Sequence, residues 1–242
     1  MHLMKADMGG AATVAAAVLA IAKLKLPINV KAVIALCENM PSSTATKPGD
    51  VVTAMSGKTI EVLNTDAEGR MVLSDALYYL TTTYKPHTVM TVATLTGAMV
   101  IALGDVFTGA FCSNESLWED LQNAGLVTGD QFWRMPLHAN YRELMTQSNV
   151  ADLANIGVKN GGGSCSAAAF LREFVPRQSE PPVEPLDMNE DDTLQTRYAH
   201  LDIAGVMETS SDSGYNVKGM SGRPARSFVE LARQLSKKGS SK

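Results

Sequence analysis

Residues 64–70, Asn-Thr-Asp-Ala-Glu-Gly-Arg, constrain the fold of this chain more than any other stretch. They place two carboxylates, a glycine and a guanidinium between a β-branched, alternating run at 59–63 and a run with helical spacing that ends at Tyr84. The charged cluster therefore lies where a strand gives way to the start of a helix. Open α/β sheets bind ligands outside the carboxyl ends of their strands, so we expect a ligand site here.

Two interpretations of this stretch are open. Thr65 and Glu68 have the spacing of a capping box, and Asp66 would favour the positive end of the helix dipole. Alternatively, Asp66 and Glu68 are two residues apart, so both can face one cavity from a turn or an extended segment. Arg70 then adds a planar fork for an anion. Oxygen-rich clusters of this kind bind hard cations.

Composition excludes several classes of protein. The chain has 242 residues, of which 45% are hydrophobic, enough for one large α/β domain with a sizeable core or two small ones. The net charge is −4, and the only basic pair is at the C-terminus, so nucleic acid is not an expected partner. We expect neither a membrane span nor a signal peptide. Cys37, Cys112 and Cys165 lack a Cys-x-x-Cys spacing, which favours small buried hydrophobes in a reducing cytosol.

Strand-like and helix-like runs alternate along the chain. This order predicts an α/β fold of three layers, with a mixed, mostly parallel sheet covered by helices on both faces. Residues 28–37 form a near-continuous apolar run, which favours a buried parallel strand. The other expected strands are 51–55 and 59–63 as a hairpin, 88–95, 106–112 and 198–206; the expected helices are 11–24, 70–84, 115–124, 139–145, 164–175 and 223–236.

The remaining segments are expected to be irregular. Trp133, Met135 and Pro136 belong to a connection, and the glycine run 161–163 opens a helix. Residues 176–197 contain four prolines and an acidic run, which predicts a solvated surface loop. Residues 237–242 predict a disordered tail. We expect residues 1–242 to form a single domain.

Familiar hydrolase motifs are missing from the sequence. None of the four histidines has the spacing of a His-Glu-x-x-His zinc site. No Gly-x-Ser-x-Gly elbow supplies a serine nucleophile.

Five blocks, in the same order, resemble the leucyl aminopeptidase family, the two-metal cytosol aminopeptidases. The resemblance runs over nearly the whole chain. The blocks are 5–12, 64–70, 93–98, 200–205 and 218–224.

The resemblance implies a zinc-peptidase-like fold that removes N-terminal leucine and similar residues from peptides with a metal-activated water. It implies two divalent metal ions, Mn²⁺ or Zn²⁺, with Asp7, Asp66 and Glu68 as ligands. It assigns Arg70 a catalytic role in holding a bicarbonate, and it implies a cytoplasmic homohexamer. Residues implied to line the substrate cleft are Thr94, Leu95 and Gly97, and those of the apolar pocket for the N-terminal side chain are Met4, Ala204 and Met207.

The chain departs from the family in one respect. A block with Gly-Lys-Gly, Phe-Asp-Ser-Gly-Gly and a lysine, which supplies further metal ligands, is not in this sequence. The resemblance therefore implies that residues 1–242 are a single, partial catalytic domain, the carboxyl-terminal domain of the family truncated at its N-terminus. It also implies that the surface loop at 176–197 is an insertion. Two alternatives remain: a catalytically silent fragment or subunit that retains the oligomer contacts, and an anion-binding α/β module that uses Arg70. Metal analysis separates these classes, because an aminopeptidase must bind divalent cations and an anion module need not.

Overall fold

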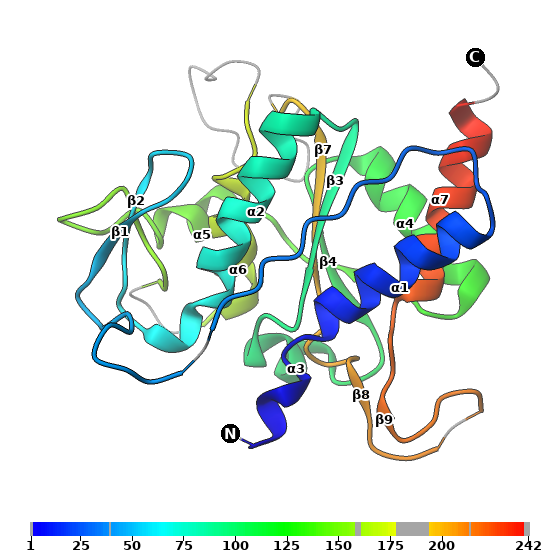
Figure 1. The fold of residues 1–242 in the computed structure, drawn as a ribbon, viewed down its shortest axis with the longest axis horizontal. Helices are drawn as coiled ribbons and strands as arrows, with labels where there is room; N and C mark the ends of the chain where they lie inside the picture. Colours follow the sequence, from blue (N-terminus) through cyan, green and yellow to red (C-terminus); the bar gives the residue numbers. More distant parts are fainter. Residues whose placement is uncertain (1, 39, 158–160, 178–193, 213, 240–242) are drawn as a thin grey trace.

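The computed structural model describes residues 2–38, 40–157, 161–177, 194–212 and 214–239, which form an α/β fold (Figure 1). Its central sheet has four strands in the order β3-β7-β4-β5. Strands β3 and β7 are parallel, β4 runs antiparallel to β7, and β5 is parallel to β4, so the sheet is mixed as expected. The strands are β3 (Thr88–Ala93), β4 (Thr108–Cys112), β5 (Phe132–Arg134) and β7 (Arg197–Asp202).

Helices cover both faces of this sheet, which confirms the three-layer arrangement (Figure 1). Successive strand residues point to opposite faces. Val89 and Tyr198 therefore join the core under α2 and α6, whereas Leu201 and Cys112 join the core under α1, α4 and α7. The helices are α1 (Gly9–Lys23), α2 (Gly69–Tyr84), α4 (Glu115–Thr128), α6 (Gly163–Arg172) and α7 (Ala225–Gly239).

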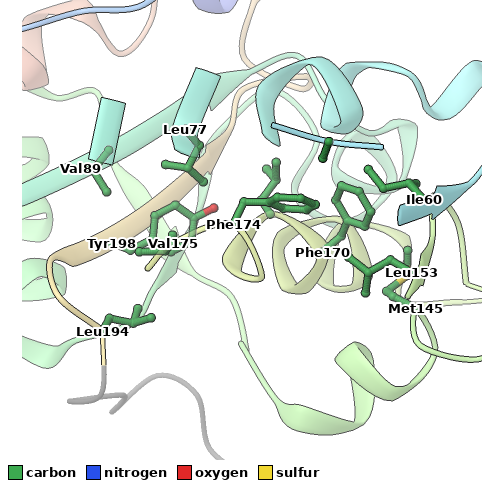
Figure 2. Close-up of a cluster of buried hydrophobic side chains, with 12 residues drawn as sticks. Ile60, Leu77, Val89, Met145, Leu153, Phe170, Phe174, Val175, Leu194 and Tyr198 are labelled. Carbon is green, nitrogen blue, oxygen red and sulfur yellow. The ribbon is translucent and has the colours of Figure 1, made fainter. Parts of the chain in front are cut away.

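A second, smaller sheet has the order β1-β2-β6. Strands β1 and β2 form the expected antiparallel hairpin, and β6 pairs in parallel with β2. Figure 2 shows how one hydrophobic cluster joins the two sheets, with Phe170 beside Ile60 and Leu153 and Phe174 nearer to Tyr198. The remaining elements are β1 (Val51–Thr53), β2 (Thr59–Glu61), β6 (Leu153–Ala154), β8 (Glu208–Thr209), β9 (Gly219–Met220), α3 (Gly97–Leu103), α5 (Ala139–Glu143), and the 3₁₀ turns η1 (His2–Ala6) and η2 (Thr65–Ala67).

Helix α1 packs against β3 and α7. A Cβ on Gly10 would lie 2.2 Å from the carbonyl oxygen of Val92, so this close approach requires glycine. Among the described residues, Met4–Lys23 is long and apolar enough to cross a membrane by length and composition alone. A helix in the core of a globular protein passes the same test.

The expected buried strand at 28–37 is wrong. No strand is assigned there, Leu36 is 85% exposed, and Cys37 is exposed rather than buried. The physical reason is the lack of a hydrogen-bonded neighbour, since no strand of the described residues pairs with this run. It lies instead beside β1 and α2, where Val33, Leu36 and Cys37 help to line a groove of about 510 Å³. Cys112 and Cys165 are buried as expected.

Other boundaries differ from the expectation. Trp133 lies in β5 rather than in an irregular connection, because residues 132–134 pair with β4. Helix α4 continues through Gly125 to Thr128, and Gly129 ends it in the left-handed conformation (φ 80°). Helix α7 extends through Gly239, beyond the start of the expected tail. Residues 178–193 of the expected insertion and 240–242 of the tail lie outside the described residues.

Candidate active site

The candidate site lies where β3 and β7 end side by side. Ala93 at the end of β3 is in register with Asp202 at the end of β7. The two segments that leave these strands, 94–97 and 203–207, contain five of the residues expected to bind substrate. Figure 1 shows the start of α2 and the start of α1 at the same end of the molecule. This is the edge at which α/β sheets bind their ligands.

The turn 64–70 contains no capping box, and Gly69 brings it beside Leu95 in the segment after β3. Asn64 caps the η2 turn, since its side chain accepts the Asp66 N–H at 2.9 Å. Glu68 occupies the cap position of α2, but its side chain makes no capping hydrogen bond. Thr65 is the first residue of η2 and not the cap of either helix. The carboxylates of Asp66 and Glu68 are therefore not used to cap a helix.

The three expected metal ligands have accessible carboxylates. Asp7 and Asp66 are exposed and Glu68 is half-buried. The hydroxyl of Thr94 donates to the Asp7 carboxylate at 2.5 Å, which ties Asp7 to the segment after β3. Within the described part of the chain, no three His, Cys, Asp or Glu side chains converge as a metal site. The oxygen ligands suit a hard divalent cation, but the described residues do not complete its coordination.

Arg70 is the buried cation of the site. As the second residue of α2 it is only 7% exposed, and within the described residues its Nε and Nη1 have no hydrogen-bond partner. Burial lowers the pKa of the Arg70 guanidinium to about 10. The carboxylates of Asp202 and Glu68 have the opposite, smaller effect, because they favour its charged form. Buried guanidinium donors are normally paired, so these two N–H groups are suited to an anionic ligand.

Asp202 organises the segments that follow both strands, a role that the sequence analysis did not assign. Its carboxylate is fully buried and accepts the hydroxyl of Thr96 at 2.6 Å and the backbone N–H groups of Leu95 and Ala204, each at 3.2 Å. Burial raises the pKa of the Asp202 carboxyl to about 6, although these hydrogen bonds favour the ionised form. One side chain thus fixes Leu95 and Ala204, from the expected cleft and the expected pocket, relative to each other.

Other expected substrate residues come together around Gly9. A Cβ on Gly9 would lie 3.2 Å from the Thr94 methyl group and 3.7 Å from the Met207 Cβ, so these two residues face the start of α1. Met4 is 47% exposed, and its carbonyl accepts the Asp7 N–H at 2.8 Å. Gly97 is exposed at the first turn of α3. Leu95 lies beside the start of α2, because its Cδ1 would be 3.2 Å from a Cβ on Gly69.

Two further residues were missed from the sequence. His200 is fully buried and stacks on Phe111, and its Nδ1 lies 3.0 Å from the Thr91 hydroxyl. Burial, with a smaller contribution from Arg70, lowers the pKa of His200 to about 3, so it is neutral. Asn155, directly after β6, hydrogen-bonds the turn that carries Asp66. Its only sequence signal is a polar residue at the end of a short apolar run, which is too common to be informative.

The fold and site define an α/β domain with a polar site at the carboxyl ends of two parallel strands. Residues 1–229 match the family model of the cytosol aminopeptidase family, catalytic domain. The cytosol aminopeptidase of Xenopus tropicalis is 50% identical over 237 residues, and that of Homo sapiens is 48% identical over 236; each alignment covers 98% of this chain and 42% of the relative. The chain belongs to the cytosol aminopeptidase family.

Solved structures agree with this family. A mutant of tomato leucine aminopeptidase matches with a TM-score of 0.79 and 37% identity, covering 96% of this chain and 41% of that one. The bottromycin maturation enzyme BotP in complex with Mn matches with a TM-score of 0.80 and 34% identity, covering 98% of this chain and 48% of that one. The chain thus spans less than half the length of these relatives.

Proposed function

We propose that this chain is the catalytic part of an aminopeptidase that removes N-terminal leucine and similar residues from peptides. The observation that carries the proposal is the turn 64–70, which combines two accessible carboxylates with the buried Arg70 and lies beside Leu95, in the segment after β3. Family membership supports the reaction class. The comparisons do not favour the catalytically silent alternative.

The donor chemistry at this edge supports two divalent metal ions, Mn²⁺ or Zn²⁺. Asp66 and Glu68 form no ion pair within the described residues, so their negative charges are available to cations. Asp7, oriented by Thr94, is the third proposed ligand. When bound, such ions lower the pKa of a coordinated water to about 7 and polarise a peptide carbonyl. A structural relative is known in complex with Mn, which supports this choice of metal.

Arg70 is proposed to hold a small anion, such as bicarbonate, that assists proton transfer. Its two unpartnered N–H groups and its burial support this role, because a charge-assisted hydrogen bond is strong where water is excluded.

The substrate is proposed to lie across the ends of β3 and β7. Thr94, Leu95 and Gly97 would line the cleft along the peptide backbone. Met4, Ala204 and Met207 would form the apolar pocket for the N-terminal side chain, and small and flexible apolar residues suit leucine. The hydrogen bonds from Leu95 and Ala204 to Asp202 support a preformed cleft.

We further propose a cytoplasmic homo-oligomer, a hexamer by analogy with the family, that binds neither nucleic acid nor membrane. The printed name of the relatives, cytosol aminopeptidase, supports the location. Sedimentation of the purified chain tests the assembly.

The function is tested in a chimera, in which this chain replaces the matching 237 residues of the Xenopus tropicalis relative. With Mn²⁺ or Zn²⁺ added, we expect the chimera to release leucine from leucyl amide and the isolated chain to do so weakly or not at all. Asp66→Asn should abolish turnover. Asp75→Asn is the control and should retain turnover, because the Asp75 carboxylate accepts the Met55 N–H on another face of α2. A folded chimera without turnover would refute the proposed function.

A further inference from the structure

Asn155 holds a buried position next to the candidate metal ligands. It follows β6, whose Leu153 and Ala154 pair in parallel with Ile60 and Glu61 of β2. Its own N–H continues this pairing by donating to the Glu61 carbonyl at 2.9 Å. The residue has no exposed surface. Its side chain therefore lies against the segment that leaves β2, residues 62–67.

The side chain accepts two hydrogen bonds from backbone groups and donates two to backbone groups, and its Nδ2 also contacts Met71 Sδ at 3.6 Å. Asn155 Oδ1 accepts the backbone N–H of Leu63 at 2.9 Å and that of Asn64 at 3.3 Å. Asn155 Nδ2 donates to the carbonyl of Asn64 at 2.6 Å and to that of Ala67 at 3.4 Å. These four partners also fix the amide orientation, because the flipped amide would direct N–H groups at the two N–H donors.

These contacts replace the backbone pairing that the turn cannot make for itself. The η2 turn has three residues, and Asp66 and Glu68 lie within it and directly after it. A turn this short has few internal hydrogen bonds, so its conformation depends on outside partners. Asn155 contacts the turn on both sides of Asp66, at Asn64 and at Ala67. A side-chain amide carries both N–H donors and a carbonyl acceptor, so Asn155 can bind both kinds of backbone group.

We propose that Asn155 is a positioning residue that sets the carboxylates of Asp66 and Glu68 for metal binding. It acts through the backbone of the turn rather than by contact with metal or substrate. This inference rests on the proposed function, which supplies the metal. Removing the side chain would also take away the partner of the Leu63 N–H, whereas the Asn64 carbonyl would keep the Ala67 N–H at 3.2 Å.

The test uses the full chain and its Asn155→Ala and Asn155→Asp variants. The aspartate keeps the acceptor, loses the donor and is nearly isosteric. Asn114→Ala is the matched control, because Asn114 also accepts a backbone N–H, that of Leu117, but at the start of α4. Mn²⁺ binding is measured by equilibrium dialysis, and hydrogen exchange of the Leu63 and Asn64 amides is measured without metal.

We expect both Asn155 variants to bind Mn²⁺ about 10- to 100-fold more weakly than the wild type, the usual effect of losing a partner that orients a ligand. Their Leu63 and Asn64 amides should exchange faster, and Asn114→Ala should match the wild type in both measurements. Wild-type affinity for Mn²⁺ in Asn155→Ala would overturn the inference. If the wild type binds no Mn²⁺, the metal proposal fails. Unchanged hydrogen exchange of the Leu63 and Asn64 amides in Asn155→Ala would separately overturn the positioning role.

Discussion

The hydroxyl of Thr94 donates a hydrogen bond to the carboxylate of Asp7 across a sequence separation of 87 residues. It joins the turn before α1 to the segment after β3. A proposed metal ligand is thereby oriented by a residue of the proposed substrate cleft. Metal affinity and cleft geometry should consequently depend on the same contact.

Replacing Thr94 by valine removes the hydroxyl while keeping the shape of the side chain. Without this bond the exposed Asp7 carboxylate is free to rotate, so we expect Mn²⁺ affinity to fall about 10-fold. Thr94→Ser keeps the donor and should retain most of the affinity. Equilibrium dialysis measures both variants, and Thr82→Val, which removes a hydroxyl bonded only within α2, is the control. Equal affinities for Thr94→Val and the wild type would show that Asp7 does not depend on Thr94.

Asp202 should make stability depend on pH. Its pKa in the folded chain is about 6, compared with 3.8 for a free carboxyl, so the folded state binds the proton more tightly. Its contribution to stability is therefore fully present below pH 3.8 and is lost as the pH rises through about 6. Two pKa units correspond to a difference of about 3 kcal/mol in the free energy of unfolding.

Asp202→Asn tests this dependence, because asparagine does not titrate. Urea unfolding in chelator at several pH values should show the wild type losing stability relative to the variant between pH 3.8 and 6. Asp75 is exposed, so the stability of Asp75→Asn should depend on pH in the same way as that of the wild type. Parallel curves for the wild type and Asp202→Asn would contradict the raised pKa.

We expect Arg70 to contribute to turnover and to destabilise the folded state. Its buried Nε and Nη1 lack partners among the described residues, and such groups destabilise the folded state. Arg70→Met, which fills a similar volume, should leave the thermal midpoint unchanged or raised. In the chimera the same change should lower kcat about 100-fold or more, with little effect on KM, if Arg70 assists proton transfer. A raised KM with unchanged kcat would instead make Arg70 a substrate anchor.

Local patterns were sufficient to predict much of the fold. The hairpin of β1 and β2, the helix after Gly69 and the buried strand ending at Ala93 follow from side-chain spacing and from breakers such as Pro86. Residues 28–37 show the limit of this reasoning. An apolar run predicts burial, but a strand also needs a hydrogen-bonded neighbour, and hydropathy does not identify one. Trp133 is the converse case, because pairing with β4 makes a strand of a segment that is too short to show an alternating pattern.

The site was partly predictable for the same reason. The charged turn and its place between a strand and a helix are local features, and the family blocks assign roles to its residues. Asp202 and Asn155 act through hydrogen bonds to backbone groups far away in the sequence: about 107 residues for Asp202 and Leu95, and 91 for Asn155 and Asn64. No local pattern identifies a backbone partner at such separation, so these two residues emerge only from the structure.

Anomalous diffraction from crystals of this chain grown with Mn²⁺ tests the central claim most directly. We predict an anomalous peak bonded to the carboxylates of Asp66 and Glu68, at the carboxyl ends of β3 and β7, with weaker occupancy in a crystal of Asp66→Asn. A saturated crystal with no peak there, or with the two carboxylates directed to opposite sides of the turn, would contradict it.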